Sequence, residues 1–355
     1  MFKKLIQGLA VSFFGIFLSL LIIEAAFRLI ANYKPSAPKW SDRPKFYFKD
    51  ESAETIQDYA YSKKKPSGRF RIAVVGDFFT FAPYMQFTDA FPKKLEQMLN
   101  LNDVKLRAEV INYGVPAYST THEVPVVRKA IEEGADLVLL QITLNDPELK
   151  RYTPQEINLN LDDPFAPLVF EGRMAKLANY WRTLAFVLTR LHNEKTHKAY
   201  RDYFFDLFEN KRTWNAFQKA FKRIQELCQD ADVPFAAVIF PLFGLPLDDS
   251  YPFHPIHEKL AAFLTDNKVD FLDISSSYAG IPLERLQVMP GLDRHPNEIG
   301  HRIAAEEIYY WLDLEGLIPE ELKIRRVYSE RIGITGKGLI NLTKEASGQG
   351  EKTSR

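Results

Sequence analysis

Hydrophobic and polar residues alternate along the chain in blocks that predict a parallel α/β sheet. Short and almost continuously apolar runs predict five buried strands, at 71–75, 109–112, 136–142, 234–240 and 269–274. Apolar residues at helical spacing predict helices between and after them, at 91–99, 124–131, 214–229, 255–265 and 297–312. Strands separated by helices favour a parallel sheet with right-handed crossovers, and continuously apolar strands indicate helices over both faces. We therefore predict a three-layer α/β/α fold with a flavodoxin-like parallel sheet.

The N-terminal segment is the longest apolar run of the chain. It has no charged residue from Leu5 to Ile23 and follows Lys3 and Lys4. These nineteen residues nearly span a hydrocarbon core of ~30 Å at ~1.5 Å per residue. The run is longer than the ~7–15 apolar residues of a cleaved signal peptide. We predict a transmembrane signal anchor over residues 1–30 that contacts the lipid bilayer through residues 5–23.

The charges that flank this segment suggest an orientation. Lys3 and Lys4 favour a cytoplasmic N-terminus, although five basic residues at positions 28–45 weaken the asymmetry. We expect a single-pass protein of a bacterial-type inner membrane, with the domain outside the cytoplasm.

Composition changes divide the rest of the chain. Residues 31–69 form a predicted stalk whose prolines and aromatic residues indicate packing against the domain, which covers 70–315. Residues 147–212 interrupt the alternation and are rich in aromatic and charged residues. They predict a helical insertion with a small core of its own, or a lid or protein-partner surface beside the site. Residues 316–355 form a C-terminal extension with a polar end that we expect to be disordered.

Composition also excludes several functions. Formal net charge is zero, which argues against a nucleic-acid partner. The single cysteine, Cys228, allows no intrachain disulfide and lies in an apolar helical pattern that predicts a buried thiol. His254 and His257 are three residues apart at a helix start, but no accompanying ligand motif follows, so no metal is predicted. No phosphate-binding glycine loop is present, and no cofactor is expected.

Polar residues gather just after the predicted strands, where ligands bind in open parallel sheets. The four blocks are 76–80 (GDFFT), 112–116 (NYGVP), 144–146 (LND) and 293–297 (DRHPN). Each has a structural explanation when taken alone: Gly114 permits a tight turn, Asn145 ends a strand, and Asn297 caps a helix. Their joint occurrence at strand ends, in this order, predicts one common site.

The four blocks resemble those of the SGNH/GDSL hydrolase superfamily of esterases, lipases and carbohydrate acyl-transfer enzymes, over roughly residues 68–315. The resemblance implies an SGNH-type sheet and a serine nucleophile in the first block. It further implies an oxyanion hole from the Gly114 amide and the Asn145 side chain, with His295 as the base. Asp293 matches the orienting acid in branches with Asp-x-His-Pro-Asn, whereas many members carry that acid at the position of Leu292.

The nucleophile position departs from the family pattern, because Phe78 stands where the resemblance implies serine. A serine mechanism needs a hydroxyl within about 2.6–3.2 Å of the histidine nitrogen, and phenylalanine has none. Asp77 and Thr80 are left as supports of the cleft. Three substitutes remain open: the hydroxyl of Thr80, the hydroxyl of Ser119, or a water activated by His295 and held by Asp77.

These observations lead to three functional hypotheses. The first is a catalytically impaired SGNH-like protein that acts as a binding or scaffolding component of the cell envelope, with an acylated glycan or lipid as the implied ligand. The second is an active esterase or O-acyltransferase that uses Thr80 or the His295-activated water. The third is a structural protein of a membrane complex that uses the 147–212 insertion as its contact surface.

Overall fold

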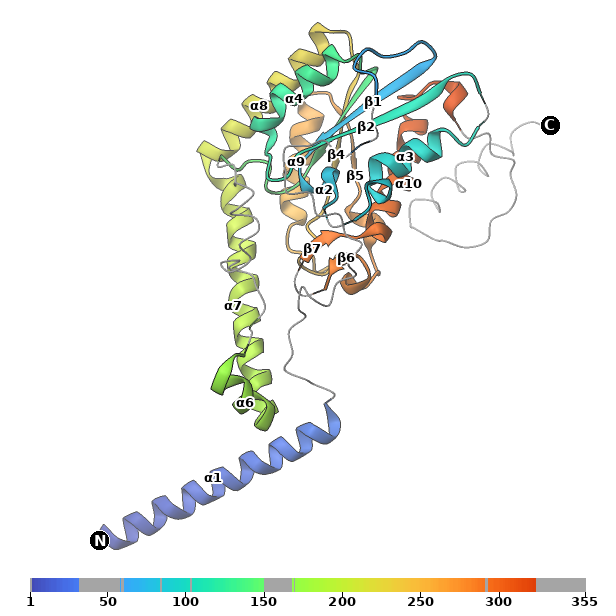
Figure 1. Ribbon diagram of the computed structural model, residues 1–355. Helices are drawn as coiled ribbons and strands as arrows, with labels where there is room; N and C mark the ends of the chain where they lie inside the picture. The colour runs from blue at the N-terminus through green and yellow to red at the C-terminus, as the bar shows by residue number, and fades with distance from the viewer. Residues whose placement is uncertain are drawn as a thin grey trace, which may run out of the picture.

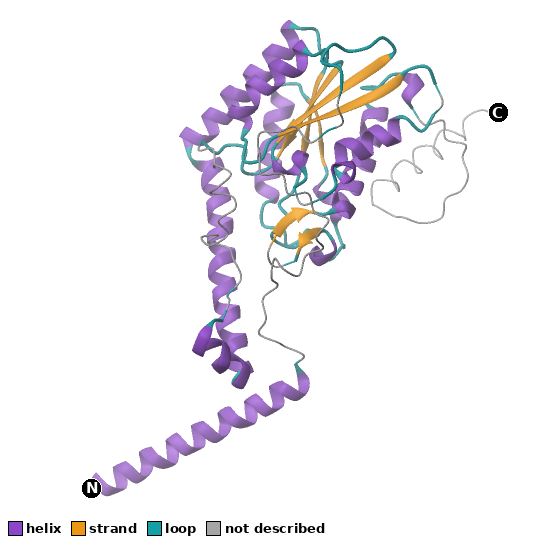
Figure 2. Cartoon of the chain, viewed as in Figure 1, coloured by secondary structure: helices purple, strands orange, loops and turns teal. Residues whose placement is uncertain are grey.

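The computed structural model describes residues 2–31, 58, 61–83, 85–102, 104–149, 168, 170–290 and 293–323. A five-stranded sheet forms its centre, in the order β2-β1-β3-β4-β5 (Figures 1 and 2). The strands are β1 Arg69–Gly76, β2 Arg107–Gly114, β3 Leu137–Ile142, β4 Phe235–Ile239 and β5 Asp270–Asp273. Every neighbouring pair is parallel. The predicted parallel sheet is confirmed, and its strand order is that of flavodoxin-like folds.

Helices cover both faces of the sheet (Figure 1). Helices α3 (Phe91–Leu99) and α10 (Glu298–Leu314) pack together on one face, where the backbone N–H of Phe91 donates to Nδ1 of His301. Helices α4 (Thr120–Glu132), α8 (Lys211–Asp230) and α9 (His254–Asp266) lie on the other face. The rings of Phe217 and Phe263 join α8 to α9 with centroids 5.7 Å apart. The three-layer α/β/α prediction is therefore confirmed.

The central strands are buried on both faces, which explains why they appear in the sequence as continuous apolar runs. Ile72, Val74, Val138 and Leu139 have no exposed surface, although neighbours along a strand point to opposite faces of the sheet. Both faces are thus covered, as continuous apolar runs require.

The last helix begins as its sequence predicts. The side chain of Asn297 accepts hydrogen bonds from the backbone N–H groups of Ile299 and Gly300, so Asn297 is the N-cap of α10. The segment before it differs from the expectation, because β7 (Asp293–Pro296) pairs with β6 (Gln287–Met289) in an antiparallel hairpin. The strand β6 has only three residues and β7 is almost entirely polar, so neither shows the apolar run of a buried strand.

Short helices are also present. Helix α2 (Phe78–Phe81) follows β1 directly. The 3-10 helices are η2 Phe87–Asp89, η3 Ser275–Tyr278, η4 Leu283–Arg285 and η5 Glu320–Leu322.

The N-terminal helix α1 runs from Phe2 to Ile30 and lies outside the α/β domain (Figure 1). Its segment Ile6–Ile30 has a mean hydropathy of 2.3 in its most apolar window and is long enough to cross a membrane. It is the one such helix among the described residues.

The insertion contains two described helices, α6 (Gly172–Tyr180) and α7 (Arg182–Glu209), while residues 150–167 and 169 lie outside the described residues. The C-terminal end of α7 differs from the expected separate core. Its Tyr200 and Phe204 belong to the main hydrophobic core, and both rings contact Phe253, with centroids 5.9 and 5.6 Å away.

The predicted stalk is described only at Asp58 and from Tyr61 onward. The Asp58 carboxylate accepts from the backbone N–H of Asn112 on β2 at 2.7 Å, and the Tyr61 hydroxyl donates to Glu133 at 2.9 Å. This end of the stalk packs against the domain. Of the C-terminal extension, residues 324–355 lie outside the described residues, and Leu322 is fully buried.

Candidate functional site

The candidate site lies at the C-terminal ends of β1 and β3. In this strand order the connections wind to one side of β1 and then to the other side at β3, and ligands of open parallel sheets bind beyond the strand ends at such a point. Two glycines allow α2 to lie close against the ends of β1 and β2. A Cβ atom on Gly76 would lie 2.4 Å from Oγ1 of Thr80 on α2, and one on Gly114 would lie 2.3 Å from the backbone nitrogen of Phe81, also on α2. Both distances are far below van der Waals contact, so the close approach of α2 requires glycine at both positions.

Asp77 connects the two strand ends. Its Oδ1 accepts from the N–H of Phe79 at 2.9 Å and caps α2. Its Oδ2 accepts from the Thr143 hydroxyl and from Nδ2 of Asn145, both at 3.0 Å. Burial raises the pKa of Asp77, although these three hydrogen bonds and the nearby His295 act in the opposite direction. The carboxyl group therefore positions Asn145 as well as the start of α2.

Asp293 and His295 form a pair within β7. The distance from Nδ1 of His295 to Oδ1 of Asp293 is 2.9 Å, and the same oxygen accepts from the His295 backbone N–H at 2.9 Å. Asp293 is buried, whereas 28% of the His295 side chain is exposed. A buried carboxylate that holds a partly exposed imidazole by one nitrogen is the arrangement of an oriented base.

Phe78 occupies the side of His295 that faces α2. The centroid of its ring lies 4.9 Å from the centroid of the imidazole, at an interplanar angle of 41°. Phe79 contacts the same imidazole with centroids 5.9 Å apart. Aromatic packing thus covers this side of the imidazole, and Phe78 offers it no hydroxyl group.

The other predicted hydroxyls have structural partners. Thr80 has no exposed surface, and its hydroxyl donates to Oε1 of Gln141 at 2.8 Å. Ser119 caps α4 in a capping box with His122. The Gly114 amide, implied as an oxyanion donor, donates instead to Oδ1 of Asn112 at 2.9 Å. Asp77, Phe78, Asn145, Asp293 and His295 are thus brought together, while the Thr80 hydroxyl and the Gly114 amide are engaged inside the protein.

Several buried acids beside the site were not found by sequence reasoning. Asp146 accepts from the backbone N–H of Thr143 at 2.6 Å, and burial together with Asp77 raises its pKa to about 8. Glu123 on α4 is fully buried, and neither of its carboxyl oxygens has a hydrogen-bond partner among the described residues. Burial, Asp146 and Asp77 raise the pKa of Glu123 well above its usual range. Glu123 gives no signal in the sequence, because a glutamate in a helix is usually on the surface.

Two further polar residues did carry a sequence signal. Gln141 interrupts the apolar run of β3 and accepts from both the Asp77 N–H and the Thr80 hydroxyl. Thr143 directly follows the same strand and donates to Asp77. A polar residue inside a buried strand needs a partner, so the strand pattern itself points to both residues.

The insertion lies beside the site. The guanidinium carbon of Arg294 lies 5.5 Å from the centroid of the Tyr200 ring on α7. The Tyr203 hydroxyl, also on α7, donates to Glu148, whose pKa burial raises to about 7. Helix α7 therefore contacts both the hairpin that carries His295 and the loop that carries Asn145.

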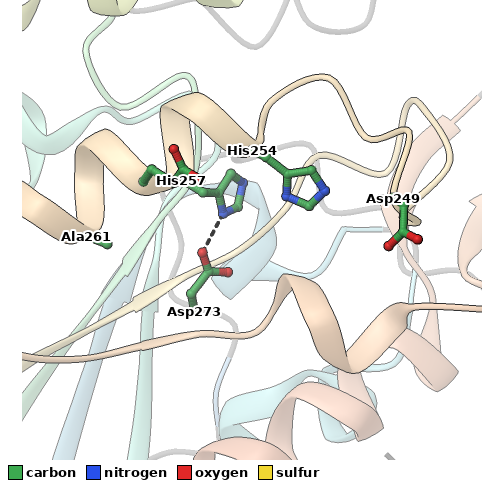
Figure 3. Close-up of a pocket in the computed structure, with 6 residues that line it drawn as sticks. Asp249, His254, His257, Ala261 and Asp273 are labelled. Carbon is green, nitrogen blue, oxygen red and sulfur yellow. Dashed lines mark hydrogen bonds and ion pairs between the residues drawn. The ribbon is translucent and has the colours of Figure 1, made fainter. Parts of the chain in front are cut away.

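A cavity of about 380 Å³ lies elsewhere, at the start of α9 (Figure 3). It is lined by Asp249, His254, His257, Glu258, Ala261 and Asp273. His257 and Asp273 point toward each other, with Nδ1 2.8 Å from Oδ2, as the dashed line marks. Among the described residues, no three histidine, cysteine or acidic side chains are arranged to hold a metal ion. The cavity shares no residue with the candidate site.

Comparisons with known proteins find similarity in structure only. No protein-family model matches the chain, and no curated protein matches it in sequence. A lipolytic protein of the G-D-S-L family from Desulfitobacterium hafniense is 12% identical at a TM-score of 0.40, over 68% of this chain and 99% of that chain. A catalytic mutant of an acetylxylan esterase from Geobacillus stearothermophilus is 12% identical at a TM-score of 0.42, over 68% and 94%.

A third solved structure is larger than the region it matches. It is a two-domain esterase active on acetylated mannans, 11% identical at a TM-score of 0.43, over 75% of this chain and 53% of that chain. At these identities and TM-scores, none of the three assigns an activity to this chain.

Proposed function

We propose that this chain is a membrane-anchored SGNH/GDSL-like protein that binds a ligand in the cell envelope and does not hydrolyse esters. The observation that carries the proposal is the Phe78 ring, packed 4.9 Å from the His295 imidazole, centroid to centroid. Removing the nucleophile from such a site typically leaves only ~10³–10⁴-fold acceleration over water. The buried and hydrogen-bonded hydroxyl of Thr80 is poorly suited to take its place.

Retained polar groups support binding. Asp77 holds Asn145, and Asp293 holds His295, so both ligand-facing side chains are fixed in position without a substrate. The half-buried ring of Phe78 adds an apolar surface between them. Fixed polar groups around an apolar surface suit an acylated glycan or an acylated lipid, which combine hydroxyl groups with an apolar acyl chain. We place this site outside the cytoplasm, at a bacterial-type inner membrane crossed by α1.

The test is ester hydrolysis by the full chain in detergent, with an acetyl ester as substrate. Wild type is expected to show no turnover above His295→Ala. Phe78→Ser should regain turnover by about 10²-fold or more over Phe78→Ala, since both variants remove the ring but only serine supplies a hydroxyl to the base. Phe78→Ala is therefore the matched control for the space that the ring leaves.

One outcome would contradict the proposal, and another would contradict the interpretation of Asp293 and His295 as an intact base. Wild-type turnover that disappears in His295→Ala would show an active enzyme, and a Thr80→Val variant would then separate the Thr80 hydroxyl from an activated water. Equal turnover of Phe78→Ser and Phe78→Ala would show that the Asp293–His295 pair no longer works as a base.

Binding is measured on the same preparations by calorimetry. The probes are an O-acetylated oligosaccharide and a diacyl phospholipid presented in micelles. Wild type is expected to bind one of them more tightly than Asn145→Ala, because the variant loses a polar group held at the site by Asp77. Identical binding of both probes by the two proteins would contradict a ligand at this site.

A further inference from the structure

The end of α1 is joined to the insertion by specific polar contacts. The Glu24 carboxylate accepts from the backbone N–H groups of Arg182 and Thr183, at 3.0 and 2.8 Å, and so satisfies the first turn of α7. The Arg28 guanidinium donates to the carbonyl oxygen of Tyr180 at 2.5 Å, at the end of α6. Glu24 and Arg28 also pair with each other at 2.6 Å. One helix end is thereby bonded to both helices of the insertion.

Apolar packing accompanies these bonds. The rings of Phe27 and Phe186 lie with centroids 5.3 Å apart, and Glu24 is only 8% exposed. We call residues 171–191, which include α6 and the start of α7, the foot of the insertion. The foot meets α1 just after Ile23, where the apolar run of α1 ends (Figures 1 and 2). The foot therefore lies at the level where a membrane-crossing α1 would leave the hydrocarbon core.

The foot exposes an unusual number of large apolar side chains. Their exposed fractions run from 39 to 80%, and they are Met174, Leu177, Tyr180, Leu184, Val187 and Leu191. A group of this kind on a surface usually marks a contact with another molecule or with a membrane. The upper part of α7 is different, because its Tyr200 and Phe204 are buried in the domain core.

The charges of the foot are almost all positive. Arg173, Lys176, Arg182 and Arg190 lie between positions 171 and 191, where Glu171 is the only acid. Tyr180 and Trp181 stand at the turn between the two helices. Basic and apolar residues on short helices, with tyrosine and tryptophan among them, are typical of segments that lie in the headgroup region of a bilayer.

We propose that the foot lies in the headgroup region of the bilayer that α1 crosses and binds anionic phospholipid there. The occupant is the bilayer because the foot continues the surface of α1 at the point where that helix leaves the membrane. The inference rests on the membrane anchor of the proposed function but not on what the candidate site binds. Helix α7 then sets the distance between the membrane and the site. Arg182 starts this helix in the foot, and Tyr200, which contacts Arg294 beside the site, lies about 27 Å farther along it at ~1.5 Å per residue.

The test uses the full chain in vesicles that contain phosphatidylglycerol and a phospholipid with a nitroxide near its headgroup. Single cysteines are introduced in a Cys228→Ala background and labelled with a fluorophore. Leu177→Cys reports the foot, Phe17→Cys reports α1, and Asp202→Cys, exposed higher on α7, is the matched control. The labels at positions 177 and 17 are expected to lose most of their emission, and the label at position 202 to keep it.

The three labels separate the possible failures. Quenching at position 17 without quenching at position 177 would overturn the foot inference and leave the anchor intact. An unquenched label at position 17 would contradict the anchor itself, and the foot inference with it. Substituting Arg173→Glu and Lys176→Glu together should reduce quenching at position 177 but not at position 17. Unchanged quenching at position 177 would contradict the binding of anionic headgroups.

Discussion

Phe78 and Asp77 are neighbours in the sequence, but they act on the site in different ways. Asp77 holds the strand ends together through hydrogen bonds to Thr143 and Asn145. Phe78 fills the space beside His295 by aromatic packing, a type of contact that contributes ~0.5–1.5 kcal/mol beyond buried area. Asp77 thus fixes the geometry of the strand ends, while Phe78 covers one side of the imidazole without offering it a polar group.

The buried acids behind the site share one physical cause. Burial raises the pKa of Asp77, Glu123 and Asp146. The charge of Asp77 adds to the shifts of Asp146 and Glu123, and the charge of Asp146 adds to that of Glu123. A carboxyl group whose pKa rises on folding binds its proton more tightly in the folded state than in the unfolded chain. The folded state therefore loses stability as the pH rises through the raised pKa.

Asp146→Asn is expected to make the stability of the protein less dependent on pH. The pKa of Asp146 rises from an ordinary value of 3.8 to about 8 on folding, so its contribution is fully present below about pH 4 and is lost as the pH rises through about 8. Asparagine resembles the protonated acid, because its oxygen can still accept from the Thr143 N–H. The measurement is the urea midpoint of unfolding at about pH 5 and about pH 8.5.

The control for this prediction is Asp230→Asn, which changes an exposed acid at the end of α8. The urea midpoint of Asp230→Asn should decrease from the lower to the higher pH by as much as the midpoint of wild type does. A midpoint of Asp146→Asn that falls as steeply as wild type would contradict the assigned proton.

At the scale of elements, the long and strongly patterned segments were predictable and the short ones were not. Helix α8 was predicted over 214–229 and runs from Lys211 to Asp230, because its buried apolar residues repeat at helical spacing. The β6–β7 hairpin was missed, since neither of its short strands is a continuous apolar run. The missed hairpin carries Asp293 and His295, so the weakest element of the pattern holds two of the five residues that the candidate site brings together.

Glu24→Ala is expected to loosen the start of α7. The substitution removes the acceptors for the N–H groups of Arg182 and Thr183. Loss of a helix cap costs about 0.5–2 kcal/mol, which corresponds to roughly 2- to 30-fold faster hydrogen exchange in the first turn of α7. Exchange is followed by mass spectrometry on the full chain in detergent.

The matched control is Glu194→Ala, which removes an exposed acid from the middle of the same helix. It should leave exchange near positions 182–186 unchanged. Equal exchange of this segment in wild type and Glu24→Ala would mean that Glu24 does not stabilise the junction between α1 and the insertion.

At the scale of the whole molecule, segments far apart in the chain close the sheet and surround the site. Asp58, which precedes the domain, accepts from the N–H of Asn112 on the edge strand β2 and from Nζ of Lys93 on α3 at 2.7 Å. Lys93 is 3% exposed, so this pair is buried. Asp58 thereby satisfies one backbone N–H group on the edge strand, a group that has no neighbouring strand to bond with on that side.

Asp58→Ala is expected to lower the free energy of unfolding by about 3 kcal/mol, because breaking a buried ion pair leaves one charge with too few partners. Adding Lys93→Met should recover part of that loss, since the buried ammonium group, which keeps Glu96 at 2.9 Å but has lost Asp58, is then replaced by an apolar side chain of similar length. Both variants are compared with wild type in urea. If the double variant is less stable than Asp58→Ala, loss of the Asp58–Lys93 ion pair is not the cause of the lower free energy of unfolding.

The sequence by itself determined the class of the fold, the N-terminal apolar helix and the absence of a serine at position 78. These follow from local patterns, namely apolar runs, helical spacing and the residue types at strand ends, which do not depend on distant contacts. Only the tertiary structure decided that Asp293 pairs with His295 and that Phe78 packs on the imidazole. It also decided that the Thr80 hydroxyl bonds to Gln141 and that the Gly114 amide bonds to Asn112. These contacts depend on how the β1, β2 and β3 ends, α2 and the β6–β7 hairpin are packed against one another, and residue spacing along the chain does not encode those distances.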